Sequence, residues 1–316
     1  MRVSTSQIFD SGTQGILRNQ GALYKTQNQL STGRRVVTPE DDPVAASQVL
    51  VVTQSKNVNA QFKDNQGTAK SQLSLEETVL GSVGDELQSI MEKVIQAGND
   101  TLGAADRKKI ATELQARMDT LVSFANTQDG TGKYIFAGYQ TQNAPFSVSG
   151  NTGPYSNTNP RYVYNGDEGQ QKLQVDASLD LAISDPGSEV FVRVRDSSGN
   201  LTGRSLFDGL QNMVDALNNS TAATFRASYT QAFGDIKASL DTVVKARTDV
   251  GTRLNAIDGL TSMAEDLDLQ YSERISNLVD LDYVTAITDL IKQQMQLQAA
   301  QKSFSQTSQL SLFNVL

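Results

Sequence analysis

The stretch that decides the fold is residues 236–281, IKASLDTVVKARTDVGTRLNAIDGLTSMAEDLDLQYSERISNLVDL. Every seventh position of this stretch is apolar or aromatic: Ile236, Val243, Val250, Ile257, Ala264, Tyr271 and Leu278. The second apolar position of the repeat is leucine three times and is interrupted by Arg253 and Arg274. A seven-residue apolar repeat sustained over about six heptads is typical of a helix in a coiled coil or bundle. The sequence therefore predicts a long helix here and a mainly α fold.

Two further heptad runs lie in the first third of the chain. The first run consists of Val44, Val51 and Val58. The second run consists of Leu73, Leu80, Leu87 and Val94. The change of register near Gly67 predicts a stutter or a break in the helix. Together with a further helix expected from Asp106 to about Asn126, these runs predict a helical rod formed by 41–130 and 206–283, in which one of the two runs covers the 236–281 repeat.

Both ends of the chain carry a narrow apolar repeat of their own. These repeats consist of Phe9, Ile16, Leu23 and Leu30 at one end, and of Leu290, Leu297 and Phe304 at the other. The last segment, 284–316, has only three charged residues and seven glutamines, which is unusual for a helix exposed to water. Two paired helices leave each seam half covered, and isolated short coiled coils are marginal. We predict that 1–40 and 284–316 pair as a coiled coil, that these seven side chains form a subunit interface, and that both ends are disordered in an isolated monomer.

Residues 131–205 differ in composition from the rest of the chain. They hold four of the six prolines, nine glycines and eight of the twenty aromatic residues. Apolar residues alternate with polar or small ones from Leu173 to Ile183 and again from Val190 to Val194. Strict alternation indicates half-buried antiparallel strands, and Asn165-Gly166 is a plausible hairpin turn. The sequence predicts a small β-rich domain inserted into a long coiled-coil or helical rod built from the N- and C-terminal segments.

The composition argues against an enzyme. The chain has no His and no Cys, which removes imidazole bases, thiol nucleophiles, disulfides and thiolate metal sites. We therefore expect no catalytic residues, no cofactor and no metal. A net charge of −8 without a basic stripe disfavours nucleic acid. The chain has no run of 18 apolar residues, which predicts no membrane insertion, and its first residues lack the features of a cleaved signal peptide.

Carboxylate chemistry is the alternative that this composition leaves open. Asp41 and Asp42 are adjacent, but Pro43 follows them, and this pattern indicates the N-terminal cap of a helix. Asp167 and Glu168 are candidates for a carboxylate-based hydrolase carried on a helical stalk, although they fall in a predicted turn. A third hypothesis is an adhesin-like binding module, in which the β insert forms the tip of a helical stem.

Several short motifs resemble the flagellin superfamily of bacterial flagella. They are LSTGRR at 30–35, DDPVAA at 41–46, and the stretch 275–301 with ISNL, DYVT and QAAQ. Within the superfamily, VTPEDDPVAA at 37–46 and GKYIFAGY at 132–139 are similar to the proteins of the junction between hook and filament. Flagellin itself usually has Ala-Lys-Asp-Asp-Ala-Ala-Gly at the first of these sites, without the prolines. The resemblance covers both ends and the edges of the insert.

The resemblance implies an architecture, a location and partners. It implies an inner tube of paired terminal helices, helical rods outside it and a β domain that projects outward. It also implies an extracellular place in the flagellum, reached in unfolded form through the flagellar type III export channel. The implied partners are further copies in a ring or helical layer, another hook-associated protein on the hook side, flagellin on the filament side, and a cytoplasmic export chaperone that holds the C-terminal helix. The alternative is flagellin, the main filament subunit.

Overall fold

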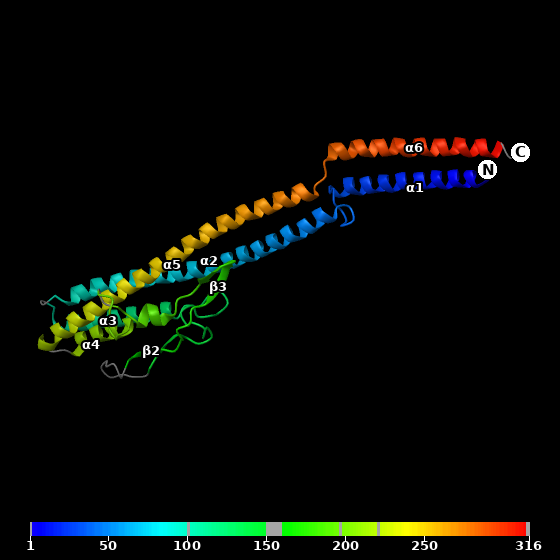
Figure 1. The fold of residues 1–316 in the computed structure, drawn as a ribbon. Helices are drawn as coiled ribbons and strands as arrows, with labels where there is room; N and C mark the ends of the chain where they lie inside the picture. The colour runs from blue at the N-terminus through cyan, green and yellow to red at the C-terminus, as the bar shows by residue number, and fades with distance from the viewer. Residues whose placement is uncertain (1, 100–101, 150–159, 196–197, 220–221, 314–316) are drawn as a thin grey trace. The chain divides into compact units, whose positions relative to one another are not determined.

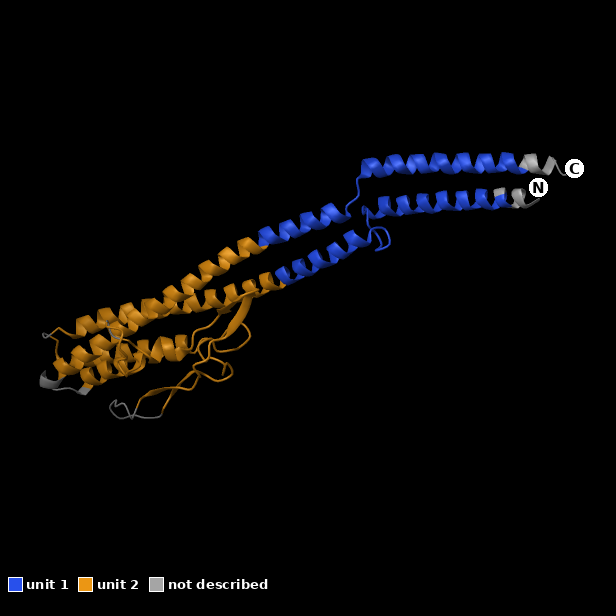
Figure 2. Ribbon diagram, in the orientation of Figure 1, with its two compact units in different colours: residues 1–60, 265–316 blue, residues 61–264 orange. Residues whose placement is uncertain are grey.

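The computed structural model of the chain describes residues 2–99, 102–149, 160–195, 198–219 and 222–313. The chain divides into two compact units, one formed by 1–60 with 265–316 and the other by 61–264 (Figure 2). Two long helices contribute residues to both units. The predicted division into terminal helices, rod and insert has three parts and different boundaries from these two units, and it remains a prediction.

Most of the described chain is helical (Figure 1). The α-helices are α1 (Arg2–Thr32), α2 (Pro43–Ala97), α3 (Ala104–Ala125), α4 (Leu206–Asn219), α5 (Ala222–Val279) and α6 (Tyr283–Phe313). Between α3 and α4 lie β1 (Phe146–Val148), β2 (Tyr162–Tyr164), β3 (Lys172–Asp176), β4 (Leu179–Ala182) and one turn of π-helix, η1 (Ser188–Val192). The predicted class, a mainly α chain with an inserted β region, is confirmed.

The unit formed by 1–60 and 265–316 contains two antiparallel helix pairs. In one pair α1 and α6 lie side by side, so the two ends of the chain are neighbours (Figure 1). In the other pair the first part of α2 lies along the last part of α5. Lys56 donates a hydrogen bond of 2.8 Å to the Ser272 hydroxyl and lies 3.8 Å from Asp268.

The buried seam of α2 differs from the prediction. Helix α2 is continuous through Gly67, and one unbroken heptad column is buried along it. That column consists of Ala45, Val52, Asn59, Gln66, Leu73, Leu80, Leu87 and Val94. The predicted Val44, Val51 and Val58 run lies one residue earlier and is exposed. The predicted stutter is therefore wrong, because two positions of the true seam are polar and the neighbouring valines gave a more apolar pattern.

The polar residue in the middle of this seam is held by hydrogen bonds. Gln66 is 2% exposed, and its amide nitrogen donates to the Val175 carbonyl at 2.8 Å. Its amide oxygen accepts from the Thr261 hydroxyl at 3.3 Å. A buried polar side chain is tolerated when its donors and acceptors find partners. Gln66 therefore connects α2 to β3 and to α5 in the unit formed by 61–264.

The hydrophobic core lies in the unit formed by 61–264. Leu73, Leu80, Leu87 and Val94 of α2 are fully buried, and the heptad from Ile236 to Ile257 of α5 is buried with them. Helix α3 adds the buried residues Ile110, Leu114, Met118, Leu121 and Ala125. Within this unit the 73–94 run therefore covers the repeat from Ile236 to Ile257, whereas the rest of the repeat lies along the first part of α2. Helices α3 and α4 pack against each other on this core.

The β insert consists of two separate antiparallel hairpins. Strand β1 pairs with β2, and β3 pairs with β4 through a bulge between Gln174 and Asp176. The predicted strand at 190–194 is wrong, because η1 takes up 188–192. In η1 the side chains of Val190 and Phe191 are both buried, so burial there does not follow the alternation of a strand. Four phenylalanines, Phe136, Phe146, Phe191 and Phe207, join the insert to α4 with ring centroids between 5.1 and 6.1 Å apart.

Candidate subunit interface

The seven predicted interface residues lie on one seam between α1 and α6. All seven side chains, Phe9, Ile16, Leu23, Leu30, Leu290, Leu297 and Phe304, are half-buried in the single chain. At one end of the seam the rings of Phe9 and Phe304 meet edge to face, with centroids 5.4 Å apart. The structure thus brings the two predicted repeats together within one molecule. Their role in contacts between subunits stays a prediction.

Small and polar residues alternate with these apolar side chains along the seam. On α1 they are Gly12, Asn19 and Thr26, and on α6 Ala286, Gln293 and Ala300. At Gly12 an added Cβ would lie 2.6 Å from the ring of Phe304, so only glycine fits there without a shift. A groove of about 470 Å³ opens beside this contact, between Phe9 and Phe304. The seam is therefore thin and incompletely filled, unlike the core of the other unit.

A second set of apolar side chains on α1 and α6 is exposed. The set consists of Leu17 and Tyr24 on α1, and Val284, Ile287, Ile291 and Met295 on α6. With about 100° of rotation per residue, the centre of each stripe is displaced by roughly 120–145° from its helix's seam, in the same rotational sense. Because the helices are antiparallel, equal displacement in that sense places both stripes on the same side of the pair. We call this side the apolar face.

Charged residues lie mostly on the opposite side of the α1/α6 pair. By the same helical phase, Arg18 and Lys25 on α1 and Asp289 and Lys292 on α6 are displaced from the seam in the other sense. The polar and apolar sides are therefore separated along most of the pair. Contiguous exposed apolar surface rimmed by polar residues is typical of protein interaction sites.

The link between α1 and α2 is held by its aspartates. Asp42 accepts the backbone N–H of Ala45 at 3.0 Å and caps α2, with Pro43 as its first residue. Asp41 accepts the N–H groups of Val37 and Thr38 at 3.0 Å. The ammonium of Lys25, 2.8 Å from Asp41, and these N–H groups hold the pKa of the Asp41 carboxyl well below its usual range. The expected capping role is confirmed.

The same link is tied to the end of α5. The Arg35 backbone N–H donates to the Val279 carbonyl, and its guanidinium donates to the Leu278 carbonyl, each at 2.7 Å. Gly33, at a φ of 68°, accepts the N–H of Leu281 at 3.0 Å. These bonds satisfy the terminal carbonyls of α5. They also hold the link between α1 and α2 against the link between α5 and α6. The sequence motif 30–46 is thus a structural joint.

The carboxylates considered for hydrolysis serve the local structure. Asp167 accepts the N–H groups of Tyr139 and Gly169, at 2.9 and 2.8 Å, within a tight turn. Glu168 forms an ion pair with Arg193. Among the described residues, no group of three or more carboxylates is arranged to hold a metal ion.

No membrane-spanning segment is found among the helices in the described ranges, because none combines sufficient length with sufficient hydropathy.

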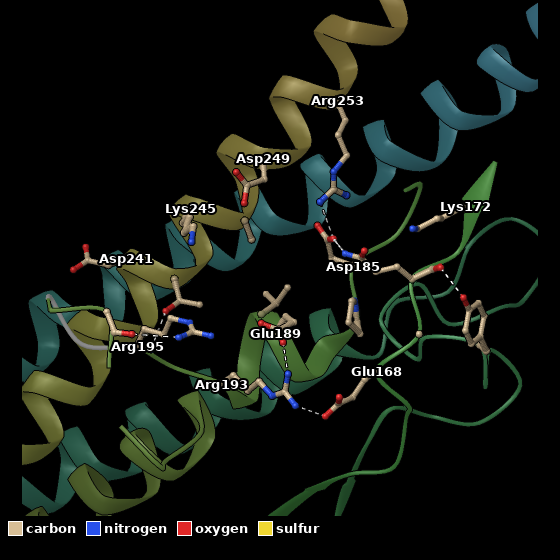
Figure 3. Close-up of a pocket in the computed structure, with 18 residues that line it drawn as sticks. Glu168, Lys172, Asp185, Glu189, Arg193, Arg195, Asp241, Lys245, Asp249 and Arg253 are labelled. Carbon is tan, nitrogen blue, oxygen red and sulfur yellow. Dashed lines mark hydrogen bonds and ion pairs between the residues drawn. The ribbon is translucent and has the colours of Figure 1, made fainter. Parts of the chain in front are cut away.

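A charged groove of about 1030 Å³ lies between α5 and the insert (Figure 3). Five acidic and five basic side chains line it: Glu168, Asp185, Glu189, Asp241 and Asp249 with Lys172, Arg193, Arg195, Lys245 and Arg253. Arg253 donates to Asp185 at 2.8 Å, and Arg193 pairs with Glu189 and Glu168. Sequence reasoning did not single out this groove, because its two walls are far apart in the chain.

Comparison with known proteins assigns the chain to a family. The bacterial flagellin N-terminal helical region matches residues 3–141. Over 100% of this chain, and 99% of the relative, the sequence is 36% identical to flagellar hook-associated protein 3 of Escherichia coli (strain K12). The chain belongs to the flagellar hook-associated protein 3 family. The hook-associated protein 3 of Salmonella typhimurium is 35% identical, again over 100% of this chain and 99% of the relative.

Two further comparisons, with a solved structure and with a flagellin, show lower sequence identity. The crystal structure of the flagellar junction protein FlgL from Legionella pneumophila matches with a TM-score of 0.59 and 23% identity. It covers 75% of this chain and 100% of that one, and at this identity the likeness shows the fold. A flagellin of Serratia marcescens is only 23% identical over 99% of this chain and 98% of the relative. The chain is therefore more similar to the two hook-associated proteins 3 than to this flagellin.

Proposed function

We propose that this chain is a structural subunit of the bacterial flagellum at the junction between hook and filament. The observation that carries the proposal is the 36% identity to a hook-associated protein 3 along the whole chain. The motif 37–46 with its two prolines supports it, since the corresponding motif of flagellin is usually without prolines. In this role the protein adapts the hook side to the flagellin filament and is not an enzyme.

The apolar face of α1 and α6 supports an assembly role. Tyr24 is 73% exposed and Val284 is 77% exposed, although both are large apolar side chains. Burying one such side chain is worth about 1.5–3 kcal/mol, so covering the face with a second copy would favour association. We propose that copies of the chain form a ring or helical layer through this face and the α1/α6 seam, and that the ends are disordered until copies assemble.

The partners outside the layer follow from the same role. We propose that another hook-associated protein contacts the hook side and flagellin the filament side of the layer. Before assembly, a cytoplasmic chaperone would cover the apolar C-terminal helix. The chain would then pass in unfolded form through the flagellar export channel to its extracellular place.

Labelling of isolated flagella tests the location. An antibody against the unit formed by 61–264 should mark one narrow band between hook and filament. Label spread along the whole filament would instead identify a flagellin. Purified chain that grows into long filaments by itself would support the same alternative.

A matched pair of substitutions on α6 tests the apolar face. Ile291 is 51% exposed and lies on the face, whereas Gln296 is exposed on the polar side. We expect Ile291→Asp to abolish filament growth and swimming while the chain is still exported, because a buried unpaired charge opposes association. Gln296→Asp should leave both intact. Normal motility of the Ile291→Asp strain would refute the role of the face.

A further inference from the structure

Three ionisable side chains from distant parts of the chain meet beneath the charged groove. Glu76 of α2 is 2% exposed and accepts the backbone N–H of Asp185 at 3.1 Å. Asp185, in the segment after β4, accepts from Gln170 at 2.9 Å and from Arg253 of α5 at 2.8 Å. Figure 3 shows Arg253 reaching down from α5 to Asp185. The cluster therefore joins the β3–β4 side of the insert to both long helices.

The cluster holds two carboxyl groups but only one guanidinium. Within the described residues, the second carboxyl oxygen of Glu76 and one terminal nitrogen of Arg253 are buried without a hydrogen-bond partner. An ionised carboxylate in such a place is costly. Burial, and then the negative charge of Asp185, raise the pKa of Glu76 to about 8, from an ordinary value of 4.5. Glu76 is therefore protonated at neutral pH and the cluster is neutral.

Other titratable groups around Glu76 come from three elements. A small cavity of about 50 Å³ beside Glu76 is lined by the loop that follows α3, and the groove above Asp185 is lined by the insert and α5. These groups are Asp129, Lys133 and Tyr134 of the loop, Glu168, Lys172, Glu189, Arg193 and Arg195 of the insert, and Asp241, Lys245 and Asp249 of α5. Apart from Asp185 and Arg253, the groove brings four acidic and four basic side chains and the loop brings one of each, so these charges balance. The surroundings therefore do not offset the effect of Asp185 on Glu76.

The two hairpins of the insert are attached to different helices. Hairpin β3–β4 is held to α2 by Asn65, which donates to the Gln174 carbonyl at 2.7 Å, and by Gln66. Hairpin β1–β2 is held to α3, where the Tyr162 hydroxyl donates to Asp119 at 2.9 Å. Only the first of these attachments includes the Glu76 cluster. A change in that cluster can therefore act on one hairpin and leave the other in place.

We propose that Glu76, Asp185 and Arg253 form a proton-linked clamp that fastens the β3–β4 hairpin to α2 and α5 and weakens when Glu76 loses its proton. When the hairpin detaches from α2 and α5, the Glu76 carboxyl becomes exposed to water and its pKa returns to the ordinary value of 4.5. Opening therefore releases a proton at any pH between the ordinary pKa and the raised one. The opening constant should rise about tenfold per pH unit from about pH 5 to pH 8 and level off above that.

Hydrogen–deuterium exchange of the full chain, followed by mass spectrometry from pH 5 to pH 9, tests the clamp. After correction for the intrinsic exchange rate, peptides covering 170–187 should gain about tenfold in opening constant per pH unit up to pH 8. Peptides of the β1–β2 hairpin should show no such rise. Equal pH dependence in both hairpins, or none in 170–187, would overturn the proposal.

Two neighbouring glutamates on α2 provide a matched pair of variants. Glu76→Gln removes the titrating group and should make the opening constant of 170–187 independent of pH. Glu77, the next residue, is paired with Arg247 of α5 at 2.7 Å on the surface, so Glu77→Gln should keep the native pH profile. A third variant, Asp185→Asn, removes the repelling charge and should shift the profile to lower pH. If Glu76→Gln keeps the native profile, or Glu77→Gln loses it, the clamp is refuted.

Discussion

Two adjacent valines on α2 test which heptad column the helix buries. Val52 is 5% exposed and belongs to the seam that faces α5, whereas Val51 is 68% exposed. Valine and aspartate have similar helix propensities, so neither substitution costs much through the helix itself. A difference in stability between Val51→Asp and Val52→Asp therefore reports the surroundings of the side chain.

The expected difference follows from burial. Removing the buried Val52 side chain forfeits about 1.5–3 kcal/mol of burial energy, and placing a carboxylate in the seam adds at least 1 kcal/mol. We expect Val52→Asp to cost about 3 kcal/mol or more, and Val51→Asp less than about 0.5 kcal/mol. With a urea dependence of about 2 kcal/mol per molar, a loss of 3 kcal/mol lowers the unfolding midpoint by about 1.5 M.

Urea unfolding of the dilute purified chain, followed by circular dichroism at 222 nm, measures this difference. The midpoint of the transition that includes α2 should fall for Val52→Asp and stay near the native value for Val51→Asp. Equal midpoints in the two variants, or a larger loss for Val51→Asp, would refute the buried column described above. The buried column of α2 would then be the one predicted from the sequence, Val44, Val51 and Val58.

Four further substitutions test other parts of the structure. Gly12→Ala should loosen the α1/α6 pair, because its Cβ would meet the Phe304 ring at 2.6 Å. Gly15→Ala meets nothing within 4 Å and should stabilise α1 by about 0.5–1 kcal/mol. Protease protection of α1 in the assembled layer measures both effects. Asp41→Asn should cost about 1–2 kcal/mol at pH 7. Because the Asp41 pKa is lowered in the folded chain, its contribution is lost as pH falls below the ordinary value of 3.8, so the native chain should approach the variant in stability in acid melts. Leu87→Ala removes a fully buried core side chain and should cost about 2–5 kcal/mol in thermal or urea unfolding.

Much of the fold was predictable because its signals are local. The heptad from Ile236 onward predicts a long helix, since side chains seven apart return to one face. The cap at Asp42 was predictable because a cap uses only the next few N–H groups of its own helix. The repeats at Phe9 and Leu290 likewise predicted helices at both ends.

The failures have a different origin. The seam of α2 contains Gln66, which is buried only because β3 and α5 supply its partners. A pattern of apolar residues does not predict a buried amide, so the heptad pattern favours the column of Val51 over the column of Val52 and Gln66. The strand predicted at Val190 failed for a similar reason. Phe191 and Val190 are both buried in η1, since the aromatic cluster and α4 surround that segment on more than one side.

By itself, the sequence determined the helices, their caps, the paired ends and the family, because each of these rests on residues that are close in the chain or spaced by the period of one helix. The tertiary structure alone decided which α2 column is buried, which side of the α1/α6 pair is apolar, and that Glu76 meets Asp185 and Arg253. Glu76 and Asp185 are 109 residues apart, and Asp185 and Arg253 are 68 apart. No local period connects such positions, so their burial, and with it the pKa of Glu76, exists only once the chain has folded.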